Sequence, residues 1–211
     1  EIGTVIEAFR MSHRAKFESI MRRFGGTAAI GHVRYATCGL DDKSYAQPFE
    51  RHHGRKWKWF GFAFNGQLTN YPELRNELLS KTDYHLVRDT DTEVLMHAIS
   101  YELRGDGKPD MVDVFRNLSR RFDGAYNIVF LNALGEMVVA RDPLGIRPLC
   151  YAWQPPLFAA ASESVALLNL GFEFVHSVEP GQMIIVGPEA PPRFARFAER
   201  TSTAHCFFEW I

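Results

Sequence analysis

The chain has 211 residues, of which 46% are hydrophobic and 23% are charged, and its formal net charge is −1. These values are typical of a soluble globular protein with a sizeable core, and the balanced charge gives no reason to expect a nucleic-acid or membrane partner. The longest apolar runs are too short to cross a membrane. Cys38, Cys150 and Cys206 form neither a CxxC pair nor a secreted disulfide framework, which favours a cytoplasmic location.

The first quarter of the chain predicts a helix, a strand and a long loop. Residues 15–24 have helical spacing, and residues 27–37 read as a buried strand that runs into a loop. The polar, turn-rich residues 38–56 predict a surface loop. Its pair His52 and His53 favours a solvated loop over a metal site, because no third ligand follows at a recognisable spacing.

The middle of the chain predicts a strand and three helices. Residues 56–64 form an apolar run typical of a strand, and Asn70 is placed to cap the helix that follows. Thr90 and Glu93 have the spacing of a capping box for a second helix, and a third covers about 111–122. The remaining strands are predicted at 125–132, 136–141, 148–153, 157–161 and 181–186. Clustered helices followed by hairpins indicate a layered α+β fold.

Asn65 and Gly66 follow the strand at 56–64 and invite two interpretations. Asn-Gly is the strongest short signal for a β-hairpin turn. However, the start of a capped helix follows within a few residues, and that favours a binding site over a hairpin. The Asn65 side-chain amide and the Gly66 backbone N–H are two donors in one place, as stabilisation of a developing oxyanion requires.

Arg34 and Asp91 are candidate partners for that site. Arg34 ends an apolar segment and either binds a ligand carboxylate bidentately or pairs with an internal acid. Asp91 opens the second predicted helix and either complements the helix dipole or accepts from a ligand ammonium. Together with Asn65 and Gly66 they describe a site for an α-amino acid. Cys38 is a candidate nucleophile or a plain loop thiol, and no base lies next to it.

Seven ordered segments carry a resemblance to a known family. They are GHVRYAT, FNGQLTN, DTDTEV, DGAYNIVFL, ARDPLGIRPL, ASES and VEPGQMIIV. In this order they resemble the glutaminase domain of class II glutamine amidotransferases, which are N-terminal-nucleophile (Ntn) hydrolases. The resemblance covers nearly the whole chain and implies a four-layer αββα sandwich formed by residues 1–211 as a single domain.

The resemblance implies a role for each candidate residue. By position, Arg34 matches the arginine that holds the glutamine carboxylate, and Thr37 lies beside it. Asn65 and Gly66 match the oxyanion hole, and Asp91 matches the acid that holds the glutamine amine. These roles agree with the interpretation drawn from the residues themselves.

The family nucleophile is a cysteine at the mature N-terminus, followed by two strands, and this chain begins past that point of the pattern. We therefore expect a glutaminase domain that is truncated at its N-terminus, lacks those strands and is inactive alone. A phosphoribosyltransferase domain with its Mg²⁺ site is expected to follow the closing segment CFFEWI in the full-length parent.

Within the family, the segments GHVRYAT, QPF and CFFEWI look most like the members that pass ammonia from glutamine to phosphoribosyl pyrophosphate in the first step of purine biosynthesis. Such a protein is expected to form a homo-oligomer. The alternatives are a domain like that of glucosamine-6-phosphate synthase or asparagine synthetase, or a non-catalytic glutamine-binding fragment. Cys206 resembles one ligand of an iron–sulfur cluster, although members without a cluster also carry a cysteine there.

Overall fold

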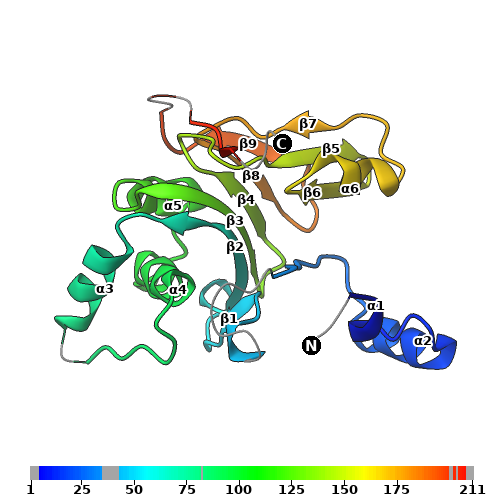
Figure 1. The fold of residues 1–211 in the computed structure, drawn as a ribbon, viewed down its shortest axis with the longest axis horizontal. Coiled ribbons are helices and arrows are strands. Elements are labelled where there is room, and N and C mark those ends of the chain that lie inside the picture. Colours follow the sequence, from blue (N-terminus) through cyan, green and yellow to red (C-terminus); the bar gives the residue numbers. More distant parts are fainter. Residues whose placement is uncertain (1–4, 35–42, 82, 200–201, 203, 208–211) are drawn as a thin grey trace.

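The computed structural model describes residues 5–34, 43–81, 83–199, 202 and 204–207. Two antiparallel sheets organise it (Figure 1). The six-stranded sheet has the order β1 (Phe49–Arg51), β2 (Phe60–Leu68), β3 (Gly124–Asn132), β4 (Met137–Arg141), β8 (Gln182–Val186) and β9 (Arg193–Arg196). The three-stranded sheet has the order β6 (Leu157–Ala161), β5 (Cys150–Gln154) and β7 (His176–Ser177). Neighbouring strands pair in antiparallel fashion throughout, so the expected α+β class is confirmed.

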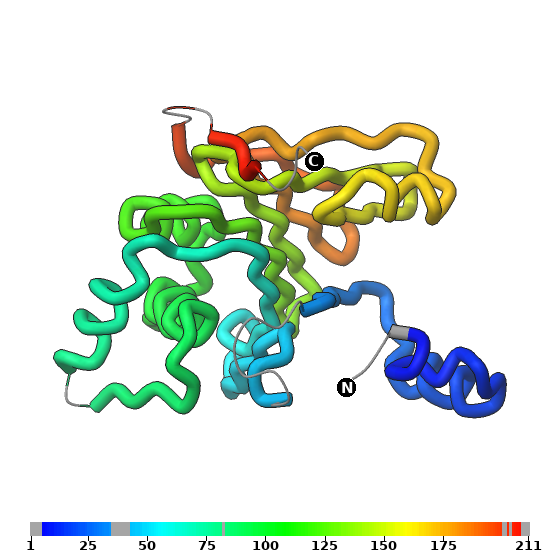
Figure 2. Tube along the Cα trace, in the orientation of Figure 1, coloured from blue at the N-terminus to red at the C-terminus, as the bar shows by residue number. Residues whose placement is uncertain are grey.

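The helices of the described chain are short and lie outside the sheets. They are α1 (Val5–Ala8), α2 (Arg14–Arg23), α3 (Tyr71–Leu79), α4 (Asp91–Glu102), α5 (Met111–Ser119) and α6 (Ser164–Asn169), with 3₁₀ turns η1 (Lys43–Tyr45) and η2 (Lys56–Lys58). Helices α3, α4 and α5 lie on one face of the six-stranded sheet (Figure 1). In Figure 2, α1 and α2 project from the rest of the chain, and α2 has no buried residue.

Side-chain alternation along the strands explains the layers. On β4, Val138 faces the core under α3–α5, whereas the next residue, Val139, packs with Ile184 against the three-stranded sheet. In that second sheet, Ala152 turns away from the first one and packs on Leu167 of α6. Each buried aliphatic side chain stabilises the fold by roughly 1.5–3 kcal/mol. Because side chains alternate with a two-residue period, the six-stranded sheet buries one face against helices and the other against the three-stranded sheet.

Two expectations about strand boundaries were wrong. Residues 27–34, the described part of the strand expected at 27–37, form no strand, and the Val33 side chain is 79% exposed. The strand expected to stop at residue 64 instead continues to Leu68, and Asn65 and Gly66 pair with Asn127 and Tyr126 of β3. Asn-Gly is therefore not a hairpin turn, because the same strand continues through it.

The helix caps agree only in part with the sequence pattern. The Thr90 hydroxyl accepts a hydrogen bond of 3.3 Å from the Glu93 backbone N–H and so caps α4 as expected. Asn70 precedes α3, but its side chain does not cap that helix. Its amide instead donates to the Arg121 carbonyl at 2.8 Å and accepts from the Asp123 N–H at 3.1 Å. This asparagine therefore ties the start of α3 to the chain leading into β3.

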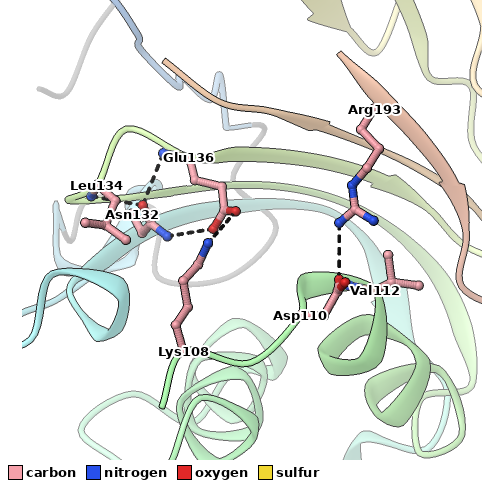
Figure 3. A network of polar contacts seen from close by, with 7 residues as sticks. All are labelled: Lys108, Asp110, Val112, Asn132, Leu134, Glu136 and Arg193. Atoms are coloured by element: carbon pink, nitrogen blue, oxygen red, sulfur yellow. Dashed lines mark hydrogen bonds and ion pairs between the residues drawn. The ribbon is translucent and has the colours of Figure 1, made fainter. Parts of the chain in front are cut away.

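A surface network holds α5 to the six-stranded sheet (Figure 3). Lys108, just before α5, pairs with Glu136 in the β3–β4 turn at 2.7 Å, and Asn132 donates to the same carboxylate at 3.1 Å. Asp110 at the start of α5 pairs with Arg193 of β9 at 3.2 Å. Because these pairs are partly exposed, each contributes only about 0–1 kcal/mol, and their main effect is on orientation.

Candidate glutamine site

A cavity of about 660 Å³ lies where the two sheets and the start of α4 meet. It is lined by residues 31–34, Tyr45, Gln47, Phe49, residues 64–67, residues 90–92, Arg147, Ser162 and Glu163. The structure thus brings together four of the residues singled out from sequence, Arg34, Asn65, Gly66 and Asp91. Thr37, the fifth, lies outside the described residues.

Asn65 and Gly66 form the wall contributed by β2. The half-buried Asn65 amide donates to the Ser162 hydroxyl at 3.2 Å, which fixes the plane of the amide next to the cavity. A Cβ atom at Gly66 would collide with the backbone carbonyl of Ala125 on β3. Glycine is therefore required here for close approach of the two strands, and this brings the backbone of residue 66 to the cavity wall.

Asp91 is the first residue of α4 and contributes a carboxylate to the cavity wall. Burial raises the pKa of this carboxyl above its ordinary value, and hydrogen bonds from the backbone N–H groups of Thr92 and Leu68 act against that shift. The Thr92 N–H lies 2.8 Å from Oδ1. A carboxylate that has lost solvent in this way is stabilised when a cation binds beside it.

Arg34 supplies positive charge to the same cavity. Its guanidinium carbon lies 5.5 Å from the centre of the Tyr45 ring, a cation–π contact that orients the side chain. Burial, and then the nearby charge of Arg34, lower the pKa of His32, so the neutral imidazole is favoured there. The cavity therefore has both cationic and anionic side chains in its wall, Arg34 and Asp91 among them, besides the amide and backbone donors of β2. A zwitterionic amino acid needs groups of both signs.

Several lining residues escaped the reasoning from individual residues. Gln47 accepts a hydrogen bond of 2.6 Å from the Phe64 N–H, which extends the β2 edge beyond its pairing with β1. Ser162 holds Asn65, and Arg147 and Glu163 complete the wall. The only signal for them was their presence in the segments QPF, ASES and ARDPLGIRPL, because their contacts join parts of the chain far apart in sequence.

The cysteines of the described chain lie away from this wall. The Cys150 thiol is buried in the three-stranded sheet and donates to the Ala161 carbonyl at 3.1 Å, and burial raises its pKa. Cys206 hydrogen-bonds through its backbone to Ile146 and does not line the cavity. No cluster of three metal-binding side chains occurs among the described residues. Cys38 falls outside them.

The profile of the glutamine amidotransferase domain matches residues 8–185. The chain belongs to the class II glutamine amidotransferase family. The resemblance drawn from the seven segments is thereby confirmed, and the family's substrate agrees in charge and polarity with the groups around the cavity.

Individual glutamine amidotransferases resemble the chain over much of its length. The amidophosphoribosyltransferase of Methanothermobacter thermautotrophicus is 36% identical over 188 residues, which is 88% of this chain and 38% of the relative. That of Escherichia coli is 32% identical over 222 residues, or 99% of this chain and 41% of the relative. The chain therefore spans about two fifths of the length of these two relatives.

A solved structure shows the same fold. The glutamine phosphoribosylpyrophosphate amidotransferase of Bacillus subtilis, in complex with ADP and GMP, superposes with a TM-score of 0.67 at 32% identity. The match covers 79% of this chain and 34% of that one. In the part of the chain that the structure describes, the helices are too short or too polar to cross a membrane.

Proposed function

We propose that the cavity binds L-glutamine and that the chain is the glutamine-hydrolysing domain of an amidophosphoribosyltransferase, which releases ammonia for transfer to phosphoribosyl pyrophosphate in the first step of purine biosynthesis. The observation that carries the proposal is the meeting of Arg34, Asp91, Asn65 and Gly66 at one cavity. The relatives are named amidophosphoribosyltransferases, and this supports phosphoribosyl pyrophosphate as the acceptor of the ammonia. The same proposal includes a four-layer αββα fold of the Ntn type for the domain. It also includes a cytoplasmic location and a homo-oligomeric state for the full-length protein.

Each end of glutamine has a matching group. The Arg34 guanidinium holds the α-carboxylate, a role that Thr37 is proposed to share, and the Asp91 carboxylate accepts from the α-ammonium. The side-chain carboxamide then lies at the β2 wall, where the Asn65 amide and the Gly66 N–H donate to its oxygen. Both donors are held in place before the ligand arrives, so they can stabilise an oxyanion with little reorganisation.

Hydrolysis at this site follows from the family chemistry. A cysteine thiolate attacks the carboxamide carbon, and the negative charge that develops on the oxygen is held by Asn65 and Gly66. The C–N bond breaks as the nitrogen takes a proton and leaves as ammonia, and water then cleaves the thioester to give glutamate. We expect the nucleophile to be the amino-terminal cysteine typical of the class, because the described lining residues include no cysteine.

No cofactor takes part in these steps. We expect Mg²⁺ to act with phosphoribosyl pyrophosphate in a separate phosphoribosyltransferase domain. An iron–sulfur cluster with Cys206 as one ligand remains an alternative for that larger protein.

Titration calorimetry with L-glutamine tests the binding proposal directly. Arg34→Ala and Asp91→Ala should each lower the affinity by about ten- to a hundredfold, the usual cost of losing a charged hydrogen bond. Arg14→Ala on α2 is the matched control, because Arg14 is exposed and pairs only locally with Glu18 at 2.9 Å. Full affinity in both site variants would refute the assignment.

The second candidate is a glutamine-binding domain without catalysis, favoured by the absence of a cysteine among the described lining residues. Release of glutamate and ammonia from L-glutamine by this 211-residue chain separates the two. Turnover that is lost in Asn65→Ala supports hydrolysis by the chain itself. Tight binding without turnover supports the second candidate for this chain.

A further inference from the structure

A buried carboxylate lies two residues beyond Asp91, in the first turn of α4. The Glu93 side chain is only 2% exposed, although its charge would be costly to bury without partners. Its Oε1 accepts from the Val87 backbone N–H at 2.8 Å, and its Oε2 accepts from the Arg88 N–H at 2.5 Å. Both oxygens therefore hold consecutive amides of the loop that leads into α4.

That loop is also held from the neighbouring helix and at its end. The Asp89 carboxylate accepts from the Tyr71 hydroxyl and from the Arg75 guanidinium of α3, each at 2.5 Å. At the end of the loop, the Thr90 hydroxyl accepts from the Glu93 N–H. Glu93 is thus bonded to this loop both through its backbone and through its side chain.

The end of the loop forms part of the cavity wall, since Thr90, Asp91 and Thr92 all line it. The orientation of the Asp91 carboxylate depends on the backbone that carries it, and the two hydrogen bonds of the Glu93 carboxylate restrain the loop that leads into that backbone. We propose that Glu93 is a positioning residue that aims the Asp91 carboxylate at the ligand ammonium. The proposal rests on the proposed glutamine site and concerns its selectivity for an α-amine.

A carboxylate is needed for this role because both of its oxygens accept hydrogen bonds. In Glu93→Gln one oxygen becomes an NH₂ group, which would face a backbone N–H donor. One of the two partly buried loop amides would lose its partner, and the loop would move away from its position beside α4. The substitution preserves side-chain size, so packing around the helix is kept.

The test compares two ligands by titration calorimetry. They are L-glutamine and glutaramate, which is glutamine without its α-amine. We expect Glu93→Gln to bind L-glutamine about tenfold more weakly and to bind glutaramate as the wild type does. Asp91→Asn should show the same pattern. Glu102→Gln is the matched control, since Glu102 lies at the far end of the same helix and accepts from Asn117 at 2.9 Å.

The outcomes separate the inference from the function on which it rests. Equal loss of both ligands in Glu93→Gln would show a merely structural role and overturn the inference, as would unchanged glutamine affinity. Failure of the wild type to bind glutamine would instead refute the proposed function, and the inference with it.

A second measurement needs no variant. The Val87 side chain is 73% exposed, so its loop amide should exchange with solvent quickly unless Glu93 holds it. Hydrogen exchange in the wild type should therefore show protected amides at both Val87 and Arg88. Fast exchange at both positions would overturn the inference even if the variant failed to fold.

Discussion

Asn65 and Ser162 are 97 residues apart in sequence and meet through a 3.2 Å hydrogen bond between Nδ2 and Oγ at the cavity wall. Asn65 belongs to β2 in the six-stranded sheet, whereas Ser162 follows β6 in the three-stranded sheet. The contact therefore joins the two sheets at the candidate site. In the proposed site, the second N–H of the Asn65 amide is the one that donates to the ligand.

Removing the Ser162 hydroxyl should release the Asn65 amide. In Ser162→Ala we expect the side-chain NH₂ signals of Asn65 to shift in a ¹⁵N–¹H spectrum and the free energy of unfolding to fall by about 0.5–1.5 kcal/mol. Ser164→Ala, at an exposed position in the first turn of α6, is the control. Unchanged Asn65 signals in Ser162→Ala would mean that the hydroxyl does not orient the amide.

Two glycines on β2 should respond differently to a methyl group. Gly66→Ala places a Cβ against the Ala125 carbonyl, and overpacking of this kind costs about 1–3 kcal/mol of unfolding free energy. At Gly61 the nearest atom to a new Cβ is Ile30 Cδ1 at 3.6 Å, an ordinary contact. Urea denaturation should therefore show a clear loss for Gly66→Ala and a change within about 0.5 kcal/mol for Gly61→Ala. Equal losses would contradict the close approach of β2 and β3.

The titration of Asp91 should appear in the pH dependence of stability. Because burial raises its pKa in the folded state, the folded protein binds more protons than the unfolded one between the ordinary value, about 3.9, and the raised value. This group therefore lowers stability as pH rises through that window. Denaturation of Asp91→Asn over the same range should show a smaller fall than the wild type, and a steeper fall would contradict the assignment.

Asp110 offers the opposite sign as a comparison. The Val112 N–H, and then Arg193, lower the pKa of this carboxyl. Its contribution is present above the ordinary aspartate pKa and is lost as pH falls through the lowered value. At neutral pH, Asp110→Asn should therefore have a lower free energy of unfolding than the wild type. The difference between the two proteins should become smaller in acid, which denaturation at several pH values would measure.

The geometry of the Arg34 fork should matter beyond its charge. Arg34→Lys keeps a cation in the cavity but replaces a planar group suited to two parallel hydrogen bonds by a single ammonium. We expect glutamine affinity to fall by about tenfold, measured by calorimetry. Arg14→Lys on α2 should bind as the wild type does. Wild-type affinity in Arg34→Lys would argue against bidentate carboxylate binding.

Local patterns predicted the elements whose physics is local. The start of α4 was found because Thr90 and Asp91 have the chemistry of a helix N-terminus, and β6 was placed at its observed bounds by a short apolar run between turns. The strands β1, β7 and β9 were missed because they are two to four residues long and depend on their partners for hydrogen bonds. The segment before Arg34 was wrongly predicted to be a strand, because apolar composition alone does not supply a neighbouring strand to pair with.

The same distinction applies to the candidate site. Arg34 stood out in the sequence because it ends an apolar segment where burial of its charge is expensive. Asn65 stood out because it precedes a glycine at the end of a strand, and Asp91 because it opens a predicted helix. Ser162 and Gln47 did not, because a serine after a strand and a glutamine before a proline are ordinary until the partner from another part of the chain is known. Their roles as hydrogen-bond partners exist only in the folded structure.

The wall that Ser162 and Glu163 contribute has a consequence for synthesis of the protein. A growing chain emerges from the ribosome N-terminus first. Arg34, Asn65 and Asp91 are therefore exposed to the cell well before the residues that complete the cavity have been made. The nascent chain can bury the face of β2 and β3 that packs on α4 early, but it cannot enclose a ligand until residue 163 has been translated and released. Glutamine should thus stabilise only the late, nearly finished polypeptide and offer no help to its earlier folding stages.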